Sequence, residues 1–580
     1  MTTGLRTRLW LLLIVAAGAA LRFYNLAWGA PYYHFHIDEH IVFAGADMLA
    51  RSAHEAAMSP KFFMYSPGPM YALIAVRRAY ELLAGHPLVL NVPHDEVIFM
   101  LLGRAISATI GTATIPVVFA VARRIAGPRA GLLAAALTAF GVLHLRESHF
   151  FTVDIPMTFF SVITLYALLF VVERGPGWRR DAAVGAAFGA ALLCKYTAIF
   201  LAPAIGLAYI LAQPRQAGAR LVAGVDVVAA LKGAARAFVP GVIGVALFLA
   251  ADPLPLLYPE KFRTDIRDWV TAPLTGAWKP IWTAQFADVT MPHVYWFTNI
   301  LWWGIGPAFE IVGLAGVVWL FVKRSRAAAV AGTFVVAYFL VAGRTITPFA
   351  RYGVPLVPAL AIAAGVLGSD LLDGPRRRLG LAVNAILLVT TAAYAAAYMH
   401  VFAAPDARLA ASSWVMHHVP QGAHVLIEPS QNMVPFGDYL NRPDFNNDYL
   451  LRGKDGVRDD YYHFVALDTY VYLYDRHVPE DTKRAYIESK LAQVDYIVID
   501  DTYLQFYQHL PEGPHAAVKK YYADLFAGRL DFELLRTFKT YPSLFGIPIH
   551  DDAAELSFRL FDHPGVFVFK RKGVRAFGSA

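Results

Sequence analysis

Long apolar runs alternate with short polar segments over the first 400 residues of the chain. A helix that crosses a membrane needs roughly 20 mainly apolar residues, and about eleven runs approach that length. We interpret as membrane spans the runs 9–28, 97–123, 130–145, 154–173, 181–195, 197–213, 237–252, 300–322, 327–343, 352–370 and 379–401. The run 68–84 is shorter and contains Arg77 and Arg78, so we interpret it as an interfacial or re-entrant helix.

The basic residues between these runs predict the orientation of the chain, because Lys and Arg concentrate in the cytoplasmic loops of membrane proteins. If the N-terminus is cytoplasmic, the cytoplasmic side receives every basic cluster: Arg6 and Arg8; Arg123, Arg124 and Arg129; Arg174, Arg179 and Arg180; Arg215, Arg220, Lys232 and Arg236; Lys323, Arg324 and Arg326; and Arg376, Arg377 and Arg378. The sequence therefore predicts a transmembrane domain over 1–402 with external loops 29–96 and 253–299.

The composition changes at about Ala403, where charged residues become more frequent and no further run is long enough to span. Residues 406–418 predict a helix, and 423–427 predict a buried strand. The alternation continues with a predicted helix at 486–493, a predicted strand at 494–499 and similar segments at 519–527, 532–538 and 565–570. We therefore expect a polytopic α-helical membrane protein whose residues 403–580 form an extracytoplasmic α/β domain.

The composition agrees with a membrane protein. Of the residues, 57% are hydrophobic and only 16% are charged, whereas soluble proteins have about 25% charged residues. The net charge of +7 comes from short clusters between apolar runs, which are topology signals and not a surface for nucleic acid. The single cysteine, Cys194, excludes intrachain disulfides and thiolate-rich metal sites. Residues 9–28 lack an Ala-x-Ala site followed by a soluble start, so we expect no cleaved signal peptide.

The stretch His34 to His40, just after the first span, holds two carboxylates and three imidazoles. Carboxylates at the mouth of a membrane helix are costly unless water, a cation or a substrate meets them. A single acid there could simply be solvated. A second loop, however, brings Asp154 to the same predicted side of the membrane. We therefore predict functional roles for Asp38, Glu39 and Asp154.

Four basic residues lie against the positive-inside bias, in or near the external ends of spans: Lys61, Arg104, Lys195 and Arg351. A cation held at such a place needs an anion. Phosphate is the natural candidate, since Arg offers a bidentate fork and Lys a point charge. The alternative is that each cation pairs with one of the acids or reaches the lipid headgroups.

The histidines also permit a metal site. In an extended chain alternate residues face the same way, so His34, His36, Asp38 and His40 could converge. Imidazole and carboxylate ligands suit Zn²⁺ or Mn²⁺. A divalent metal at His34, His36 and His40 is the alternative to a site without metal.

The acidic pair after the first span resembles that of the C-type (GT-C) membrane glycosyltransferases, particularly the bacterial relatives of protein O-mannosyltransferases and of the lipid A aminoarabinose transferase. The resemblance covers most of residues 1–400 and continues through Lys61–Pro69, Gly103–Ala108, Arg146–Asp154, Lys195–Thr197, Gly304–Pro307 and Arg351–Pro355. The turn Ser66-Pro67-Gly68-Pro69 departs from the pattern, because those proteins carry Lys or His beside a Pro-Pro turn. The segment after 402 also differs from the β-trefoil of the eukaryotic mannosyltransferases.

The resemblance implies a glycosyltransferase of the bacterial inner membrane that uses a sugar carried on a polyprenyl phosphate. It implies that Asp38 takes the proton of an acceptor hydroxyl while the anomeric centre is inverted, with Glu39 and Asp154 in support. The acceptor, a glycan, a lipid or a protein, stays open. The departing phosphate would be neutralised by the basic residues Lys61, Arg104, Lys195 and Arg351.

Three other functions were weighed against this one. A lipid-linked glycan ligase or polymerase would use the same kind of site with a larger cargo. A transporter or flippase predicts ionisable residues at mid-span and a duplicated half, whereas here they gather at the external ends and no repeat is visible. A scaffold without catalysis leaves the shared siting of Asp38, Asp154, Arg104 and Arg351 unexplained. We therefore expect an enzyme surrounded by membrane lipids, with no nucleic-acid partner.

Overall fold

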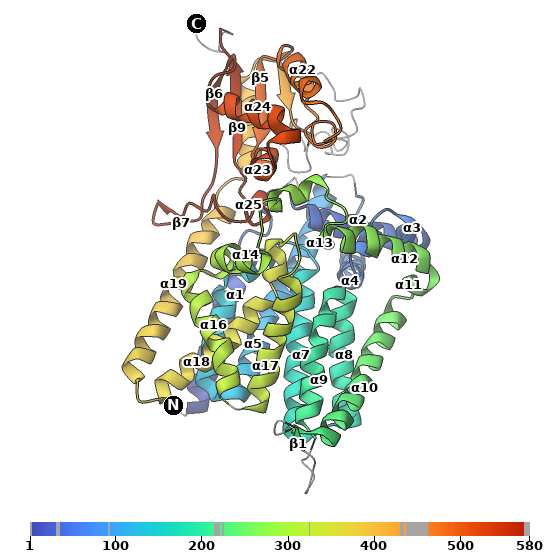
Figure 1. Cartoon of the computed structure of the whole chain (residues 1–580), viewed down its shortest axis with the longest axis vertical. Coiled ribbons are helices and arrows are strands. Elements are labelled where there is room, and N and C mark those ends of the chain that lie inside the picture. The colour runs from blue at the N-terminus through green and yellow to red at the C-terminus, as the bar shows by residue number, and fades with distance from the viewer. Residues whose placement is uncertain are drawn as a thin grey trace.

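The computed structural model describes residues 3–30, 35–90, 93–213, 221–222, 225–323, 325–429, 434–436 and 462–573. It consists of a bundle of long helices and a smaller domain, built on a β-sheet, at one end of the bundle (Figure 1). The predicted class, a polytopic α-helical membrane protein with a C-terminal α/β domain, is confirmed.

The long helices coincide with the predicted apolar runs. They are α1 (Thr3–Phe23), α5 (Pro93–Phe140), α7 (Asp154–Arg174), α8 (Trp178–Cys194), α9 (Ala202–Leu211), α10 (Val227–Ala251), α16 (Pro307–Val322), α17 (Arg326–Ala342), α18 (Leu356–Asp373) and α19 (Arg377–Ala403). Shorter helices connect them: α2 (Ile37–Arg51), α3 (Ala53–Met58), η1 (Phe62–Met64), α4 (Gly68–Ala84), α6 (Val142–Glu147), η2 (Tyr196–Leu201), α11 (Leu254–Leu257), α12 (Pro259–Asp265), η3 (Ile266–Thr271), α13 (Ala272–Thr275), η4 (Ile281–Phe286), α14 (Pro292–Tyr295), η5 (Trp296–Leu301), α15 (Trp302–Ile305) and η6 (Ala350–Gly353).

Fewer helices qualify as spans than the sequence predicts. Among the described residues six helices are long and apolar enough to cross a membrane, and the pair Pro292–Ile305 and Pro307–Val322, bent by 119°, would make a seventh. The predicted runs 97–123 and 130–145 both lie in α5, which is broken at Ala126 and Gly127. Three further runs correspond to α8, α9 and α17, which are too short. The predicted count of about eleven is therefore not confirmed.

The ends of the bundle agree with the predicted grouping of basic loops. The N-terminus, the turn between α18 and α19 and the short strand β1 (Leu221–Val222), which pairs with β2 (Val225–Asp226), lie at the end opposite the sheet domain (Figure 1). Arg215, Arg220 and Arg324 lie outside the described residues. The cytoplasmic location of this end stays a prediction.

Glycines allow two of the long helices to touch through their backbones. A Cβ atom added at Gly189 of α8 would lie 2.6 Å from the carbonyl oxygen of Gly244 in α10. Small residues at such crossings let the helix backbones approach closely. The resulting van der Waals contacts stabilise helix association in lipid, where no hydrophobic driving force acts between helices. A side chain at Gly189 would therefore force α8 and α10 apart.

The C-terminal domain contains a five-stranded sheet in the order β4-β3-β5-β9-β6. Strand β3 is parallel to β4 and β5, and β9 is antiparallel to β5 and β6. The strands are β3 (His424–Ile427), β4 (His463–Ala466), β5 (Tyr496–Asp500), β6 (Phe532–Phe538) and β9 (Val566–Arg571), with a separate hairpin of β7 (Ser543–Leu544) and β8 (Ile547–Pro548). The helices are α20 (Ala407–His418), α22 (Glu480–Leu491), α23 (Thr502–His509), η7 (Gly513–His515), α24 (Ala516–Phe526) and α25 (Leu556–Leu560).

Alternate residues of the strands face two helical layers, as the strand period requires. Leu426 and Phe569 pack in the apolar cluster that includes residues of α22, α23 and α24, whereas Val425 and Val568 pack with α20. The predicted strands at 423–427 and 494–499 and the predicted helices at 406–418 and 486–493 are confirmed. The segments 519–527, 532–538 and 565–570, for which no type was predicted, are α24, β6 and β9, and β4 is an addition.

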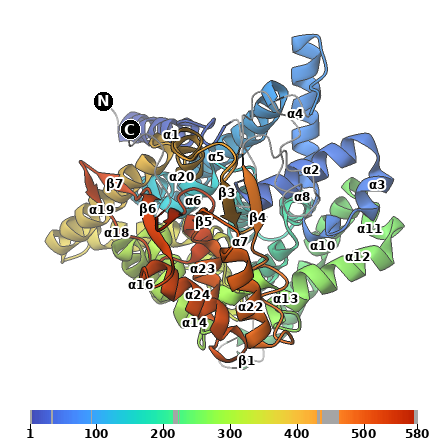
Figure 2. The ribbon, with the colours of Figure 1, turned by 90° about the horizontal axis from the view of Figure 1, so that it is seen from above.

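The sheet domain packs directly against the predicted external loops of the bundle. Ile281 and Ala284 of η4, in the predicted external loop 253–299, belong to its apolar cluster. Seen from above, the domain overlies α6, whereas α3, α11 and α12 extend beyond it (Figure 2). The loops that carry the predicted acids therefore lie at the junction of bundle and sheet domain.

Candidate active site

Asp38 and Glu39 occupy the first turn of α2. His36 is the N-cap of this helix, and its Nδ1 accepts a hydrogen bond of 3.4 Å from the backbone N–H of Glu39. The N-terminus of a helix favours negative charge, which stabilises both carboxylates there. Both side chains are buried, so the predicted acidic pair faces the interior of the protein.

Asp38 has an incomplete set of partners. Its Oδ1 accepts a hydrogen bond from the hydroxyl of Tyr65. Its Oδ2 lies 3.1 Å from Nη1 of Arg351, yet this buried oxygen accepts no hydrogen bond from the described residues. Burial, with Asp38 alongside, raises the pKa of Tyr65 well above its usual value, so Tyr65 acts as a donor to Asp38. Oδ1 is thus held by a hydrogen bond, whereas Oδ2, called the open oxygen below, has an ion-pair contact with Arg351 but no hydrogen bond from the described residues.

Glu39 accepts three hydrogen bonds. Its Oε1 and Oε2 accept hydrogen bonds of 2.9 Å each from Nε and Nη2 of Arg104, and Oε1 also accepts one from the backbone N–H of Phe151. Nη1 of Arg104 donates to the carbonyl oxygens of Leu26 and Trp28. Arg104 therefore satisfies Glu39 and two backbone carbonyls instead of facing an open pocket. Binding of donor phosphate by Arg104 stays a prediction, and this geometry favours a structural role for it.

Asp154 and Lys195 form the second pair. Asp154 is the first residue of α7, and Lys195 follows the last residue of α8. Nζ of Lys195 donates a hydrogen bond of 2.6 Å to Oδ1 of Asp154. The cation and the acid that the sequence assigns to separate loops therefore lie together.

The short helix η6 joins the two pairs. Arg351 belongs to η6 and contacts Asp38, and Nζ of Lys195 lies 5.0 Å from the ring centre of the next residue, Tyr352. Burial, with Asp38 and Asp154 nearby, raises the pKa of Tyr352 to about 12. The structure thus brings together six of the seven predicted site residues: Asp38, Glu39, Arg104, Asp154, Lys195 and Arg351.

Lys61, the seventh, lies elsewhere. Its Nζ is 4.2 Å from the ring centre of Trp269 and 5.9 Å from that of Trp282. Both tryptophans belong to the predicted external loop 253–299. No ion pair joins Lys61 to Asp38 or Asp154 in the part of the chain that the structure describes. Its role as a phosphate contact stays a prediction.

Glu147 is a site residue that the sequence did not single out. It ends α6, and one carboxylate oxygen accepts a hydrogen bond from Arg146, while Oε2 is buried and finds no hydrogen-bond partner among the described residues. Burial raises the pKa of Glu147 to about 7, opposed by Arg146 and reinforced by the charges of Asp154 and Asp38. The only sequence signal was its place in the loop that ends at Asp154.

The histidines do not form a common site among the described residues. His36 caps α2 and lies between the rings of Phe150 and Phe561, with centroids 4.6 and 4.2 Å away. His34 lies outside the described residues, and His40 belongs to α2. No group of three His, Cys, Asp or Glu side chains that could hold a metal ion occurs in the described ranges. The packing of His36 therefore gives the metal alternative no support.

A family model described as dolichyl-phosphate-mannose-protein mannosyltransferase matches residues 99–240. This segment carries Arg104, Glu147, Asp154 and Lys195. Comparison with the curated proteins gives no match.

Three solved structures are similar to the chain. ArnT from Cupriavidus metallidurans bound to undecaprenyl phosphate is 16% identical over 98% of both chains, with a TM-score of 0.43. The archaeal oligosaccharyltransferase AglB from Archaeoglobus fulgidus, in complex with an inhibitory peptide and a dolichol-phosphate, is 12% identical over 89% of this chain and 72% of its own, with a TM-score of 0.44. The S. cerevisiae Pmt1-Pmt2 complex bound to the sugar donor is 17% identical over 45% and 35%, with a TM-score of 0.33.

The match over residues 99–240 agrees with the resemblance to protein O-mannosyltransferases that the sequence led us to expect, and the apolar helices are those of a multi-pass membrane protein.

Proposed function

We propose that the protein transfers a sugar from a polyprenyl-phosphate donor to an acceptor hydroxyl on the extracytoplasmic side of the bacterial inner membrane. Nucleotide sugars stay in the cytoplasm, so a transferase that acts outside needs a donor presented by the membrane. A lipid-borne donor can place its phosphate at the interface while its tail lies between helices. The description of the matched family, which names a dolichyl-phosphate sugar, supports this donor class.

The observation that carries the proposal is the open oxygen of Asp38. Tyr65 holds Oδ1 and orients the carboxylate, while Oδ2 is buried and accepts no hydrogen bond from the described residues. A general base needs such an oxygen within hydrogen-bond reach of the hydroxyl proton. In the proposed step the acceptor oxygen bonds to the anomeric carbon, the bond from that carbon to the phosphate breaks, and Asp38 takes the hydroxyl proton. Attack opposite the phosphate inverts the anomeric centre.

Arg351 and Lys195 are the candidates that neutralise the departing phosphate. In the described structure the guanidinium of Arg351 pairs with Asp38 through Nη1, and Lys195 donates only one of its three possible hydrogen bonds, to Asp154. Both therefore have N–H groups left for phosphate oxygens. Asp154 would hold Lys195 in place between turnovers, and Glu39 would fix α2 through Arg104.

Asp38→Asn tests the assignment of the base. The variant should lose transfer activity by on the order of 10²–10⁴-fold, because a positioned general base contributes about that much. The assay follows transfer in proteoliposomes from a panel of polyprenyl-phosphate monosaccharides, beginning with mannose. Asp47→Asn is the matched control, since Asp47 lies on the same helix but pairs with Arg51 and Arg77. Full activity of folded Asp38→Asn would exclude Asp38 as the base.

The predicted sidedness can be tested with a single engineered thiol. Cys194 is the only cysteine and is buried, so Val471→Cys, at a side chain that is 62% exposed in the sheet domain, should react selectively. An extracytoplasmic domain predicts labelling by a membrane-impermeant maleimide in spheroplasts without lysis. Labelling only after lysis would reverse the proposed orientation.

A further inference from the structure

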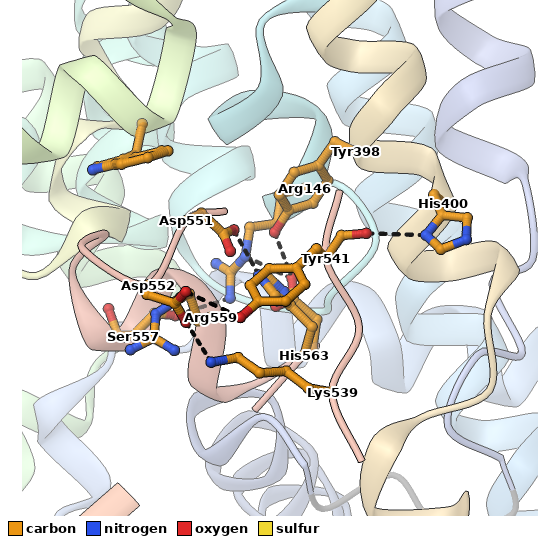
Figure 3. Close-up of polar contacts among 12 residues, drawn as sticks. Arg146, Tyr398, His400, Lys539, Tyr541, Asp551, Asp552, Ser557, Arg559 and His563 are labelled. Atoms are coloured by element: carbon orange, nitrogen blue, oxygen red, sulfur yellow. Dashed lines mark hydrogen bonds and ion pairs between the residues drawn. The ribbon is translucent and has the colours of Figure 1, made fainter. Parts of the chain in front are cut away.

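A segment of the sheet domain reaches down to the candidate active site. This segment, Asp551–His563, contains α25 and is called the docking segment below. It contacts three separate elements of the bundle, and each contact lies next to a residue of the site. Figure 3 shows part of this junction, where Arg146 and Tyr398 of the bundle meet Asp551, Ser557 and His563.

The first contact is made to η6. Oε2 of Glu555 accepts a hydrogen bond of 2.9 Å from the backbone N–H of Ala350, the residue before Arg351. The backbone N–H of Glu555 donates to Oδ1 of Asn299 at 2.7 Å. Glu555 thus ties η5 to η6 and fixes the backbone from which Arg351 projects.

The second contact is made to α6. Oδ2 of Asp562 accepts a hydrogen bond of 2.8 Å from Nε of Arg146, and Nη2 of Arg146 donates to the carbonyl oxygen of Ser557. Arg146 also pairs with Glu147. The docking segment therefore sets the position of the guanidinium that faces Glu147.

The third contact is made at the start of α2. The ring of Phe561 lies 4.2 Å from that of His36, the residue that caps the helix carrying Asp38. Arg408 of α20 donates to the carbonyl oxygens of Leu560 and Phe561. The sheet domain therefore anchors Phe561 where it packs on His36.

Asp562 is itself held by several partners. Oδ1 lies 2.7 Å from Nδ1 of His563, and Oδ2 accepts a hydrogen bond of 2.9 Å from the hydroxyl of Tyr398. Nε2 of His563 lies 2.8 Å from Oδ2 of Asp551 (Figure 3). Three side chains, Arg146, Tyr398 and His563, therefore hold the Asp562 carboxylate. Through Asp562 the docking segment is bonded to both α6 and α19.

We propose that the docking segment positions the transfer site, with Glu555, Phe561 and Asp562 as positioning residues that set Arg351, the start of α2 and Arg146. This inference rests on the proposed function. It gives the sheet domain a part in positioning the residues that carry out the chemistry. Displacements of about 1 Å in a site can lower rates by on the order of 10²-fold.

Asp562→Asn and Glu555→Gln test the proposal, because both keep the size of the side chain and remove its charge. We expect kcat to fall by on the order of 10²-fold with little change in the KM for the donor. Hydrogen exchange should rise in peptides that cover 35–40, 142–147 and 349–353. Val518→Ala, in the core of α24, is the control for destabilisation of the same domain, and it should leave kcat and those peptides unchanged.

Each outcome decides the question. Wild-type kcat and exchange in both variants, or an equal effect of Val518→Ala, would overturn the positioning role. If the charge variants do not fold, Phe561→Leu, which loosens only the contact with His36, is measured in the same way. Failure of Asp38→Asn to reduce transfer would overturn the proposed function instead. The exchange data would still report whether the docking segment orders the segments 35–40, 142–147 and 349–353.

A different observation concerns the hairpin of β7 and β8. Its two turn residues, Phe545 and Gly546, have φ of 52° and 81°. This kind of turn favours Asn-Gly, and a left-handed backbone is rare for a bulky residue. The Phe545 side chain is nevertheless 96% exposed and the nearby Ile547 is 71% exposed. The chain therefore presents an aromatic residue to its surroundings at a strained position.

The hairpin lies beside the end of α19 in both overall views (Figures 1 and 2). His400, near the last residue of α19, bonds through Nδ1 to the carbonyl oxygen of Tyr541 at 3.0 Å. A helix of 27 residues is about 40 Å long, which exceeds the hydrocarbon core of about 30 Å. The end of α19 therefore reaches the headgroup region, where aromatic residues are favoured. We infer that Phe545 and Ile547 insert into the lipid surface beside α19.

Phe545→Cys with a spin label, in nanodiscs, tests this inference. We expect the label to be accessible to oxygen and protected from a water-soluble nickel chelate, whereas a label at Val471→Cys should show the reverse. Equal exposure of both labels to the chelate would overturn the inference. Protection that persists in detergent and depends on protein concentration would indicate a protein partner and would also overturn it.

Discussion

Asp38 and Glu39 are neighbours in the chain, yet the structure treats them differently. Glu39 receives two hydrogen bonds of 2.9 Å from Arg104 and a third from the N–H of Phe151. Asp38 receives one hydrogen bond, from Tyr65, and an ion-pair contact from Arg351. Both oxygens of Glu39 therefore accept hydrogen bonds, whereas Oδ2 of Asp38 accepts none from the described residues.

This difference assigns a structural role to Glu39 and leaves Asp38 as the candidate base. The Glu39–Arg104 pair ties α2 to α5 and, through Phe151, to the loop before α7. Three of the roughly four lone-pair sites of the Glu39 carboxylate are already occupied, two of them by a guanidinium, which makes Glu39 a poorer acceptor for a substrate proton than Asp38. Because α2 is anchored by Glu39, the adjacent Asp38 can stay under-coordinated without losing its position.

Arg104→Met should have the largest effect, and it acts on stability. It leaves Glu39 buried and unpaired, which typically costs about 3–5 kcal/mol. Thermal unfolding in detergent measures this loss. Arg78→Met, at an exposed arginine, is the control and should stay near wild type. An unchanged unfolding midpoint for Arg104→Met would show that the Glu39–Arg104 pair does not stabilise the fold.

Arg351→Met should act mainly on the rate. Losing a charged group that stabilises the departing phosphate costs on the order of 10²–10³-fold in kcat. The unfolding midpoint should fall less than in Arg104→Met, since the pair with Asp38 lacks the bidentate hydrogen bonds of the other pair. Arg351→Lys should restore part of the activity. A large loss of stability with normal kcat would reverse the comparison.

Glu147→Gln should change how stability depends on pH. The folded protein keeps the Glu147 proton up to a pKa of about 7, whereas the ordinary value is 4.5. Between these pKa values the folded state binds more protons than the unfolded state, so stability falls as pH rises. The unfolding midpoint of the variant, which has no such proton, should fall less over this window than that of the wild type. Parallel curves would contradict the raised pKa.

Lys61→Ala should have the smallest effect on transfer. Its cation lies over Trp269, an interaction worth about 0.5–1 kcal/mol at an exposed site. We expect a slight loss of stability and a donor KM close to that of the wild type. A donor KM raised as strongly as in Lys195→Ala would place Lys61 at the phosphate after all.

The sequence by itself predicted the class, the long helices and most strands of the C-terminal domain. Apolar runs and the period of strands are local properties, so they can be recognised without knowledge of the fold. The count of spans could not be obtained in this way. The break at Ala126 and Gly127 lies between two predicted runs that the structure joins as α5, and α8, α9 and α17 are too short to count as spans.

For the candidate residues, the sequence predicted the location but not the partners. Placing Asp38, Asp154, Lys195 and Arg351 near one membrane face needed only topology and charge. Which acid each of these cations contacts could not be predicted, because the sequence does not show where a side chain points in the folded protein. Only the tertiary structure decided that Arg104 binds Glu39 and that Lys61 lies over Trp269.

The part played by the sheet domain depended most on tertiary structure. Glu555 and Asp562 are ordinary acids in the sequence, about 200 and 400 residues from their partners Ala350 and Arg146. Contacts at such separation leave no local pattern, since they form only when two independently ordered units pack together. The chain thus specifies its acids and helices locally, whereas tertiary packing decides that Glu39 pairs with Arg104 and that the docking segment contacts Arg146 and the backbone of η6.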